Sequence, residues 1–158
     1  MGETLTGGCQ CGAIRYRARN ATDPAICHCR MCQKAAGSVF WPFLKVPLSD
    51  LEWTRGRPAL YRSSEVGERG FCADCGTPLT FWHVGAETID LSIGSLDDPA
   101  LMEPIRQHWA GARMPWFTKL AGLPEVGSSA SPEEILRRRP FQHPDHDTGE
   151  WPNSGNLR

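Results

Sequence analysis

The chain reads Cys9-Gln10-Cys11-Gly12-Ala13-Ile14-Arg15-Tyr16 close to its start, and this stretch decides the fold. Two thiols are followed at once by a glycine, which permits the positive φ that a sharp turn after a metal ligand requires. Beyond the turn, apolar and basic residues alternate from Ile14 to Arg19, which predicts a strand with one buried face. The stretch therefore predicts a thiol-bearing turn that leads directly into a β-strand.

The remaining cysteines of the seven fall into two further groups. One group reads Cys72-Ala73-Asp74-Cys75-Gly76 and repeats the terminal glycine, whereas the other reads Cys27-His28-Cys29-Arg30-Met31-Cys32. Four thiolates around zinc form a closed structural site, whereas three protein ligands leave one position open. We therefore predict two zinc ions per chain, a structural ion held by Cys9, Cys11, Cys72 and Cys75 and a catalytic ion held by Cys27, Cys29 and Cys32.

Other interpretations of the cysteines stay open beside this one. Disulfides are uncommon in reducing compartments, and seven thiols cannot all pair with one another. Cys29 and Cys32 could form a redox pair, although no thioredoxin-like βαβ pattern surrounds them. A histidine could also fill the fourth position of the second site and close it, the candidates being His28, His83 and His108. His28 would point away from its neighbours in an extended segment, so we expect it to support the site or line a pocket.

Length and composition restrict the class of protein. The 158 residues suit one domain with a real core. The 17 basic and 18 acidic side chains give a formal net charge of -1, so no overall positive field attracts nucleic acid. No secretory signal or membrane-spanning run is visible, and we expect a cytoplasmic protein. A zinc-binding β domain is predicted over residues 1–127, followed over residues 128–158 by a linker, a short helix and a Pro-rich tail.

The pattern of the rest of the chain predicts a mainly β fold of antiparallel sheets. Strand character and flanking turn residues mark five further segments, Val39–Val46, Leu51–Thr54, Ala59–Arg62, Leu79–Val84 and Thr88–Ile93. Pro42 cannot donate a ladder hydrogen bond, so we expect an edge strand or a bulge at that point.

Two short helices are expected. The first, Arg30–Ala36, would end at Gly37 and place Cys29 and Cys32 on one face. The second begins at Ser131-Pro132-Glu133-Glu134, which combines a capping box with proline at the first helical position. The basic run Arg137-Arg138-Arg139 suits the end of this helix, which Pro140 would stop. The tail from residue 141, including His143-Pro144-Asp145-His146-Asp147, is expected to be hydrated or to lie in an intermolecular contact.

These motifs together resemble the glutathione-dependent formaldehyde-activating enzyme family, which is related to centromere protein V. The resemblance runs from about Gly7 to Pro124 and rests on the three cysteine groups with Gly37–Phe40, His108-Trp109, Pro115-Trp116 and Gly122-Leu123-Pro124. It implies an Mss4-like β fold stapled by zinc, with a structural ion on Cys9, Cys11, Cys72 and Cys75 and a catalytic ion on Cys27, Cys29 and Cys32. It also implies addition of glutathione to formaldehyde, giving S-hydroxymethylglutathione, and classification as a carbon–sulfur lyase.

Three functions follow as hypotheses. An open soft position on zinc suits a small thiol such as glutathione, which would be ionised there and attack formaldehyde or a related small aldehyde. In this hypothesis His28 relays the proton, because it is close in sequence. Alternatively, the site only captures glutathione or its adducts, or both sites are closed and the domain serves protein interaction.

Residues outside the cysteine groups give weaker signals. Arg30 and Lys34 could receive the carboxylates of a peptide-like thiol, although such charges are commonly a solvated face. The aromatic residues could line a pocket, but core positions are favoured for most of them, namely Trp41, Phe43, Trp109, Trp116 and Phe117. His108-Trp109 is the pocket candidate that we favour outside the cysteines.

Overall fold

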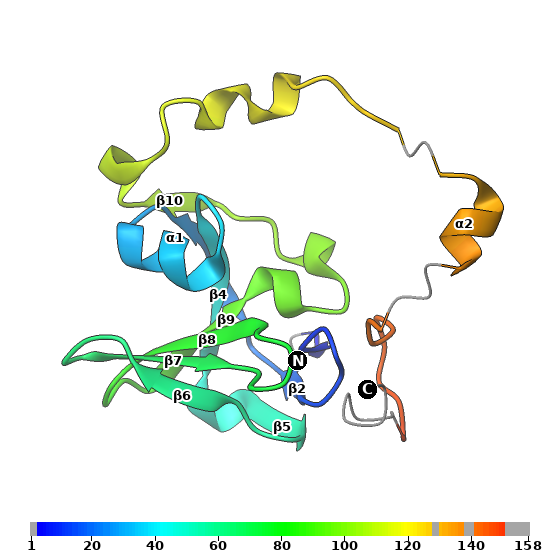
Figure 1. Ribbon diagram of the computed structural model, residues 1–158. Coiled ribbons are helices and arrows are strands. Elements are labelled where there is room, and N and C mark those ends of the chain that lie inside the picture. Colours follow the sequence, from blue (N-terminus) through cyan, green and yellow to red (C-terminus); the bar gives the residue numbers. More distant parts are fainter. Residues whose placement is uncertain (1–2, 128–129, 138–140, 151–158) are drawn as a thin grey trace.

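The structure is a computed structural model that describes residues 3–127, 130–137 and 141–150 (Figure 1). Its strands are β1 (Leu5–Gly8), β2 (Arg15–Ala18), β3 (Thr22–Cys27), β4 (Trp41–Pro47), β5 (Leu51–Arg55), β6 (Ala59–Arg62), β7 (Gly67–Phe71), β8 (Pro78–His83), β9 (Thr88–Ser92) and β10 (Arg106–His108). Its α-helices are α1 (Arg30–Ala36) and α2 (Pro132–Arg137). Short 3-10 turns are η1 (Leu48–Asp50), η2 (Ile93–Ser95), η3 (Pro99–Leu101), η4 (Ala110–Ala112) and η5 (Phe117–Gly122).

The strands form two sheets. The smaller has three strands in the order β1-β2-β5, and the larger has seven in the order β10-β3-β4-β9-β8-β7-β6. Neighbouring strands are antiparallel throughout, except that β10 runs parallel to β3. The prediction of a mainly β, antiparallel fold with few short helices is therefore confirmed.

The central strand β4 is buried on both faces, because alternate side chains of a strand point to opposite sides. Leu44 and Val46 face the small sheet and join a core that includes Tyr16, whose hydroxyl lies 2.8 Å from the Ser95 hydroxyl. The other face presents Trp41 and Phe43, which pack with residues of β3 and α1. One face of the large sheet thus carries the main core, and the opposite face carries the second cysteine group.

The strand predictions hold for the apolar segments and fail for the irregular ones. The segments β2, β4, β5, β6, β8 and β9 lie where they are expected. Strand β3 was not predicted; its Asp23 has φ 59° and its register shifts between Thr22 and Ala25. Nor was β7, where a Cβ on Gly70 would meet the Thr80 hydroxyl at 2.3 Å. A glycine at such a position allows the strands to approach closely, but it also interrupts the alternation of apolar side chains by which a strand is predicted from sequence.

The expectation of an edge strand or bulge at Pro42 is wrong. β4 is interior to the large sheet, and Pro42 pairs with Ile26 of β3. Pairing with β9 begins only at Phe43, which faces Ser92. Proline is tolerated in this interior strand because β4 has a partner on one side only at that position.

Both predicted helices form with the expected caps. α1 follows Cys29, whose sulfur accepts a hydrogen bond from the Cys32 N–H at 3.4 Å, and it ends at Gly37 with φ 61°. Before α2, the Ser131 N–H donates to the Glu134 carboxylate at 2.8 Å and the Glu134 N–H donates to the Ser131 hydroxyl at 3.2 Å. These two bonds are the reciprocal pair of a capping box. Arg138, Arg139 and Pro140 lie outside the described residues, as does the tail beyond residue 150.

Most of residues 141–150 are exposed, as expected for a hydrated tail, but the expectation is wrong for His143, which is buried. Figure 1 shows this segment returning beside the amino-terminal strands after α2. The His143 N–H donates to the Gln10 carbonyl at 2.7 Å, and the His143 side chain is only 4% exposed. Asp147 binds the guanidinium groups of Arg15 at 2.9 Å and Arg17 at 3.0 Å. The basic residues that alternate along β2 therefore hold the tail, a role that the strand pattern alone does not reveal.

Replacing Asp147 with asparagine is expected to loosen this tail. Burial opposes the charged form of Asp147, but hydrogen bonds from Arg15 and Arg17 outweigh it and hold its pKa below the ordinary value. Removing the charge should weaken docking of residues 141–150 by about 1–2 kcal/mol, the range for hydrogen bonds to a charged group. Amide hydrogen exchange should become faster in this segment, whereas Asp145→Asn should leave it unchanged because Asp145 has no ion pair among the described residues. Equal exchange in both variants would refute the role of Asp147.

The pairing of Asp147 with Arg15 also predicts a pH dependence. A carboxyl group whose folded pKa is depressed stabilises the docked state above its unfolded pKa, near 4, and loses this effect as the pH falls through the folded pKa. The protection factors of the tail amides, which compare measured exchange with the intrinsic rate at the same pH, should therefore fall below about pH 4 in the native chain and change less in the Asp147→Asn variant.

No helix among the described residues has both the length and the apolar character needed to cross a membrane. The division of the chain at residue 127 stays a prediction.

Candidate metal centres and the adjoining cavity

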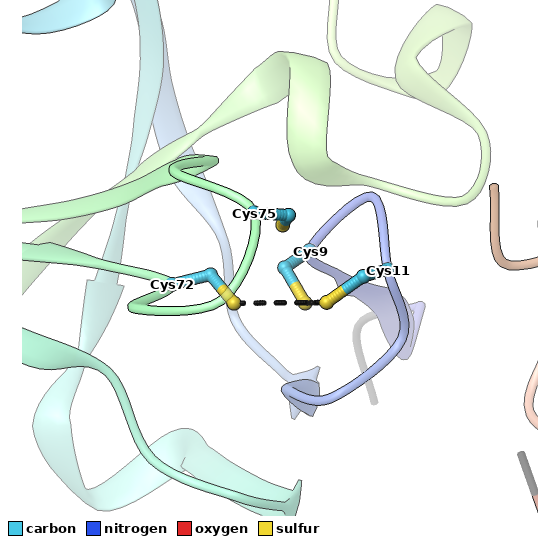
Figure 2. Close-up of side chains that lie close together, drawn as sticks. All are labelled: Cys9, Cys11, Cys72 and Cys75. Carbon is cyan, nitrogen blue, oxygen red and sulfur yellow. Dashed lines mark hydrogen bonds between the residues drawn. The ribbon is translucent and has the colours of Figure 1, made fainter. Parts of the chain in front are cut away.

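The first cysteine group joins two loops that are far apart in the sequence. Cys9 and Cys11 lie in the turn between β1 and β2, and Cys72 and Cys75 lie in the turn between β7 and β8. Figure 2 shows the four side chains meeting from these two loops. We call this set the four-cysteine cluster. The glycines behind it, Gly12 and Gly76, have φ values of 75° and 78°, as expected for sharp turns after a ligand.

The four-cysteine cluster fits a tetrahedral zinc ion. Its sulfur atoms all lie within 4.8 Å of one another, and the sulfur atoms of Cys9 and Cys11 are 3.5 Å apart. The sulfur atoms of Cys11 and Cys72 are 3.8 Å apart. Two ligands 2.3 Å from a tetrahedral centre are separated by about 3.8 Å, so these distances match a Zn–thiolate site. All seven cysteines are free of disulfides.

The surroundings of the cluster shift the pKa values of its thiols in opposite directions. The Ile14 N–H donates to the Cys9 sulfur at 3.2 Å, and the Cys75 sulfur lies 3.1 Å from the Thr77 hydroxyl. Burial raises the pKa of Cys72 to about 11. For Cys75, burial also acts upward, but hydrogen bonds with Thr77 outweigh it and lower the pKa to about 6. A divalent cation held by the cluster would favour the thiolate form of all four cysteines, because thiols bind metal in the deprotonated form.

The second group, which we call the three-cysteine cluster, is local in sequence. Cys27 ends β3, Cys29 caps α1, and Cys32 lies in the first turn of that helix. Their sulfur atoms lie within 4.8 Å of one another, and no fourth metal-ligating side chain of the described residues joins them. The helix was expected to present two of these thiols together, and it does. The donor set matches a zinc site with one position open.

Hydrogen bonds and a nearby cation shift the pKa values of two thiols in the three-cysteine cluster in opposite directions. Hydrogen bonds with Cys32 raise the pKa of Cys27. The pKa of Cys32 is lowered to about 5, first by its hydrogen bond with Cys27 and then by Arg69. The Arg69 guanidinium donates to the Cys32 sulfur at 3.4 Å and lies 4.8 Å from the centre of the Phe81 ring. A fixed cation beside the cluster therefore favours negative charge on sulfur.

A cavity of about 320 Å³ opens beside the three-cysteine cluster, and we call it the sheet cavity. Its floor is one face of the large sheet, and it is lined by Cys27, Cys29, Met31, Cys32, Trp41, Phe43, Lys45, Ser63, Ser64, Val66, Arg69, Phe81, His83, Asp90, His108 and Trp109. Part of this floor is a row of neighbours in register across four strands, namely Lys45 of β4, Asp90 of β9, Phe81 of β8 and Arg69 of β7. The size lies at the lower end of the range for small-molecule sites.

The far end of the cavity holds an ion pair. The Lys45 ammonium lies 2.9 Å from a carboxylate oxygen of Asp90, which is 8% exposed. Burial raises the pKa of Asp90, although the hydrogen bond from Lys45 opposes this shift. The indole N–H of Trp41, another lining residue, is buried and has no hydrogen-bond partner among the described residues. The cavity thus combines apolar walls with a few polar groups at defined places.

Several sequence-based pocket candidates lie elsewhere. The His28 ring packs edge-on against Phe117 at 4.9 Å and its Nε2 lies 3.0 Å from the Gln107 side-chain oxygen. It does not line the sheet cavity, so its position does not support the proton-relay hypothesis. Arg30 donates to the Gln33 side chain at 3.2 Å, and Lys34 lines a separate hollow. Neither basic residue faces the three-cysteine cluster from the cavity.

The aromatic candidates divide between core and surface. Trp41 and Phe43 are buried as expected, and they also line the sheet cavity. Trp116 is exposed, so a core position is wrong for it, and Trp109 is 73% exposed. The preference for His108-Trp109 as a pocket segment is confirmed, because both residues line the sheet cavity.

Sequence reasoning missed the charged floor of the cavity, namely Arg69, Lys45 and Asp90. The period-two pattern offered a signal for one of them, because Trp41, Phe43 and Lys45 occupy alternate positions of β4 and must share a face. Arg69 lies in a strand that was not predicted, and no local pattern in the predicted strand Thr88–Ile93 distinguishes Asp90 as a cavity residue.

Comparison with known proteins gives three similarities. The family model described as glutathione-dependent formaldehyde-activating enzyme matches residues 4–112. An uncharacterized lyase of Schizosaccharomyces pombe (strain 972 / ATCC 24843) is 34% identical over 86 residues, which are 51% of this chain and 59% of that protein. The chain thus spans little more than half the length of this curated relative. A crystal structure of a Rhodobacter sphaeroides protein superposes with a TM-score of 0.53 at 21% identity, over 65% of this chain and 98% of that one. At this identity the superposition shows a shared fold.

Proposed function

Because the chain belongs to the glutathione-dependent formaldehyde-activating enzyme family, we propose that it promotes addition of a small thiol to formaldehyde or a related aldehyde. The observation that carries the proposal is the three-cysteine cluster, which opens on a cavity and has no fourth ligand from the described residues. The thiol we propose is glutathione, and the product is the S-hydroxymethyl adduct. The similarity to a protein named as a lyase is consistent with this reaction class.

We assign the two clusters different roles. The four-cysteine cluster would hold a structural zinc ion that staples the β1–β2 turn to the β7–β8 turn. Zinc held by Cys27, Cys29 and Cys32 would leave a position for a thiol and lower the pKa of the thiol that it binds. The partition into four and three ligands is supported by the separate grouping of the sulfur atoms.

The chain's own side chains would prepare the thiol and the aldehyde for reaction. Arg69 places a positive charge 3.4 Å from the Cys32 sulfur, which favours the anionic form of a thiol beside the cluster. Trp41, Phe43 and Phe81 cover the cavity with apolar surface and reduce the water around the reacting atoms. The addition forms one carbon–sulfur bond and transfers one proton from the thiol to the carbonyl oxygen, so it needs no redox partner.

Exchange spectroscopy of glutathione with formaldehyde tests the proposal. The protein loaded with two zinc ions per chain should accelerate exchange between free glutathione and its hydroxymethyl adduct by about 100-fold or more over the unassisted reaction, as positioned proton transfer and proximity do. Unchanged exchange together with glutathione binding would identify a carrier. Absence of glutathione binding would identify two closed sites.

A further inference from the structure

We propose that the Lys45–Asp90 ion pair at the far end of the sheet cavity binds the α-amino-acid head group of the thiol substrate. The Lys45 ammonium would take the α-carboxylate, and the Asp90 carboxylate would take the α-ammonium group. This inference rests on the proposed function, because it places the other end of the same molecule at the three-cysteine cluster. It names the substrate class as thiols that carry a free zwitterionic head, such as a γ-glutamyl peptide.

The pair has hydrogen-bonding capacity left for such a ligand. Lys45 donates one of its three N–H groups to the Asp90 carboxylate at 2.9 Å, which leaves two for a ligand. Among the described residues, Asp90 accepts no hydrogen bond from any other group. Burial raises the pKa of Asp90 despite Lys45 and the weaker effects of His83 and His108, which means that these groups do not fully compensate for its desolvation. The α-ammonium group of a ligand would give Asp90 a second cationic partner and so offset more of its desolvation. The α-carboxylate of the same ligand would give Lys45 a second anionic partner.

The cavity has the right length for a tripeptide thiol. Asp90 lies two strands away from Arg69, which corresponds to about 10 Å at the usual strand spacing. Arg69 in turn contacts Cys32. In a γ-glutamyl-cysteinyl peptide seven bonds separate the head-group Cα from the sulfur, a span of about 9 Å when extended, so the thiol can reach the three-cysteine cluster while the head group reaches the pair. Phe81 and Phe43 lie between the two ends and offer apolar contact to the atoms that join them.

The arrangement of charged side chains in the sheet cavity also favours the Lys45–Asp90 end as the site for a zwitterion. Arg69, the cation at the cysteine end, has no carboxylate partner among the described residues, and it lies beside sulfur ligands. Lys45 and Asp90 instead offer one positive and one negative group side by side. A thiol that carries only a carboxylate would leave Asp90 without gain, and a thiol that carries only an amine would leave Lys45 without gain.

The test measures how zinc-loaded protein binds four thiols that share a cysteinylglycine end. Glutathione has the complete head, glutaryl-cysteinylglycine lacks the amine, 4-aminobutyryl-cysteinylglycine lacks the carboxylate, and butyryl-cysteinylglycine lacks both. Titration calorimetry should show that glutathione binds about 10- to 100-fold more tightly than the thiol without a charged head, as expected for desolvated charge-assisted hydrogen bonds. The thiols with half a head should lie between these limits.

A double variant isolates the pair without leaving a buried charge unpaired. Lys45→Met/Asp90→Asn should bind glutathione and butyryl-cysteinylglycine with equal affinity, whereas Lys34→Met should keep the preference because Lys34 lies outside the sheet cavity. A head-group preference that survives in the double variant would overturn the inference, and so would equal affinities for all four thiols in the native protein. If none of the thiols binds, the proposed function fails and the inference fails with it.

Discussion

Replacing Cys72 with alanine is expected to remove one zinc ion per chain and to lower the stability of the whole fold. Cys72 is 1% exposed and contributes one of four sulfur atoms that meet from two distant loops. A structural zinc site contributes roughly 10–16 kcal/mol of binding energy in zinc-finger peptides, and that energy is folding energy when the site forms only in the folded chain. We therefore expect the free energy of unfolding to fall by about 3 kcal/mol or more and the Tm to fall by about 6–12 °C.

The reason for the large effect is the length of chain that the cluster closes. Cys11 and Cys72 are 61 residues apart in the sequence, so the ion joins the small sheet to the large one across a long loop of the chain. A cross-link over such a loop removes more entropy from the unfolded chain than a cross-link over a few residues. A hydrogen bond from the Gln10 N–H to the Thr77 hydroxyl at 3.0 Å also joins the two turns.

Metal analysis and thermal unfolding measure this expectation together. The matched control is Thr77→Val, which removes the hydroxyl beside Cys75 and keeps all four sulfur ligands. It should retain full metal content and lower the Tm by only a few degrees, since it removes one hydrogen-bonding group. Unchanged zinc content and Tm in Cys72→Ala would show that the four-cysteine cluster is not a structural metal site.

The cysteine pattern predicted the grouping of the ligands because each group lies at a turn that glycine or a helix start makes visible. Cys11-Gly12 and Cys75-Gly76 carry the glycines that adopt positive φ, and the distance between the two turns in sequence does not obscure that local signal. The apolar strands were predictable for the same reason, since Leu44, Val46 and Leu91 are buried by the alternation that the sequence shows.

The cavity floor could not be predicted because it is made by register between strands, which the sequence does not state. Arg69 faces Phe81, and Phe81 faces Asp90, only because β7, β8 and β9 pair with particular offsets. Local spacing likewise suggested Arg30 and Lys34 as charges near the thiols, but both point elsewhere because the helix turns them away from the cavity. The docking of Asp147 on Arg15 could not be predicted for a similar reason, since a contact between residues 132 positions apart leaves no local pattern in the sequence.

Replacing Cys29 with serine is expected to abolish the proposed reaction while leaving the fold intact. Cys29 caps α1 through a hydrogen bond that its sulfur accepts from the Cys32 N–H at 3.4 Å. Serine is among the preferred residues at this position, so its hydroxyl can replace the cap and keep the helix. The substitution therefore removes a thiolate from the three-cysteine cluster with little structural disturbance. Only two thiolates remain, which is too few for a stable zinc site.

Three measurements follow for this variant. Zinc content should fall from two ions per chain to one, glutathione should no longer bind, and its exchange with formaldehyde should return to the unassisted rate. The Tm should change by less than about 4 °C, because the three-cysteine cluster closes only a short segment of chain and contributes little to the entropy of folding. This pattern is the opposite of that expected for Cys72→Ala, in which stability falls first.

The contrast between the two variants separates the roles of the two clusters. Lys34→Met serves as the control on the same helix, and it should retain both zinc ions and full exchange because Lys34 lies outside the sheet cavity. If Cys29→Ser kept both the second zinc ion and accelerated exchange, the reaction could not depend on the three-cysteine cluster. If it lost the ion but still bound glutathione, the thiol would be held by the charged cavity floor rather than by the metal, which would move the binding energy to Arg69, Lys45 and Asp90.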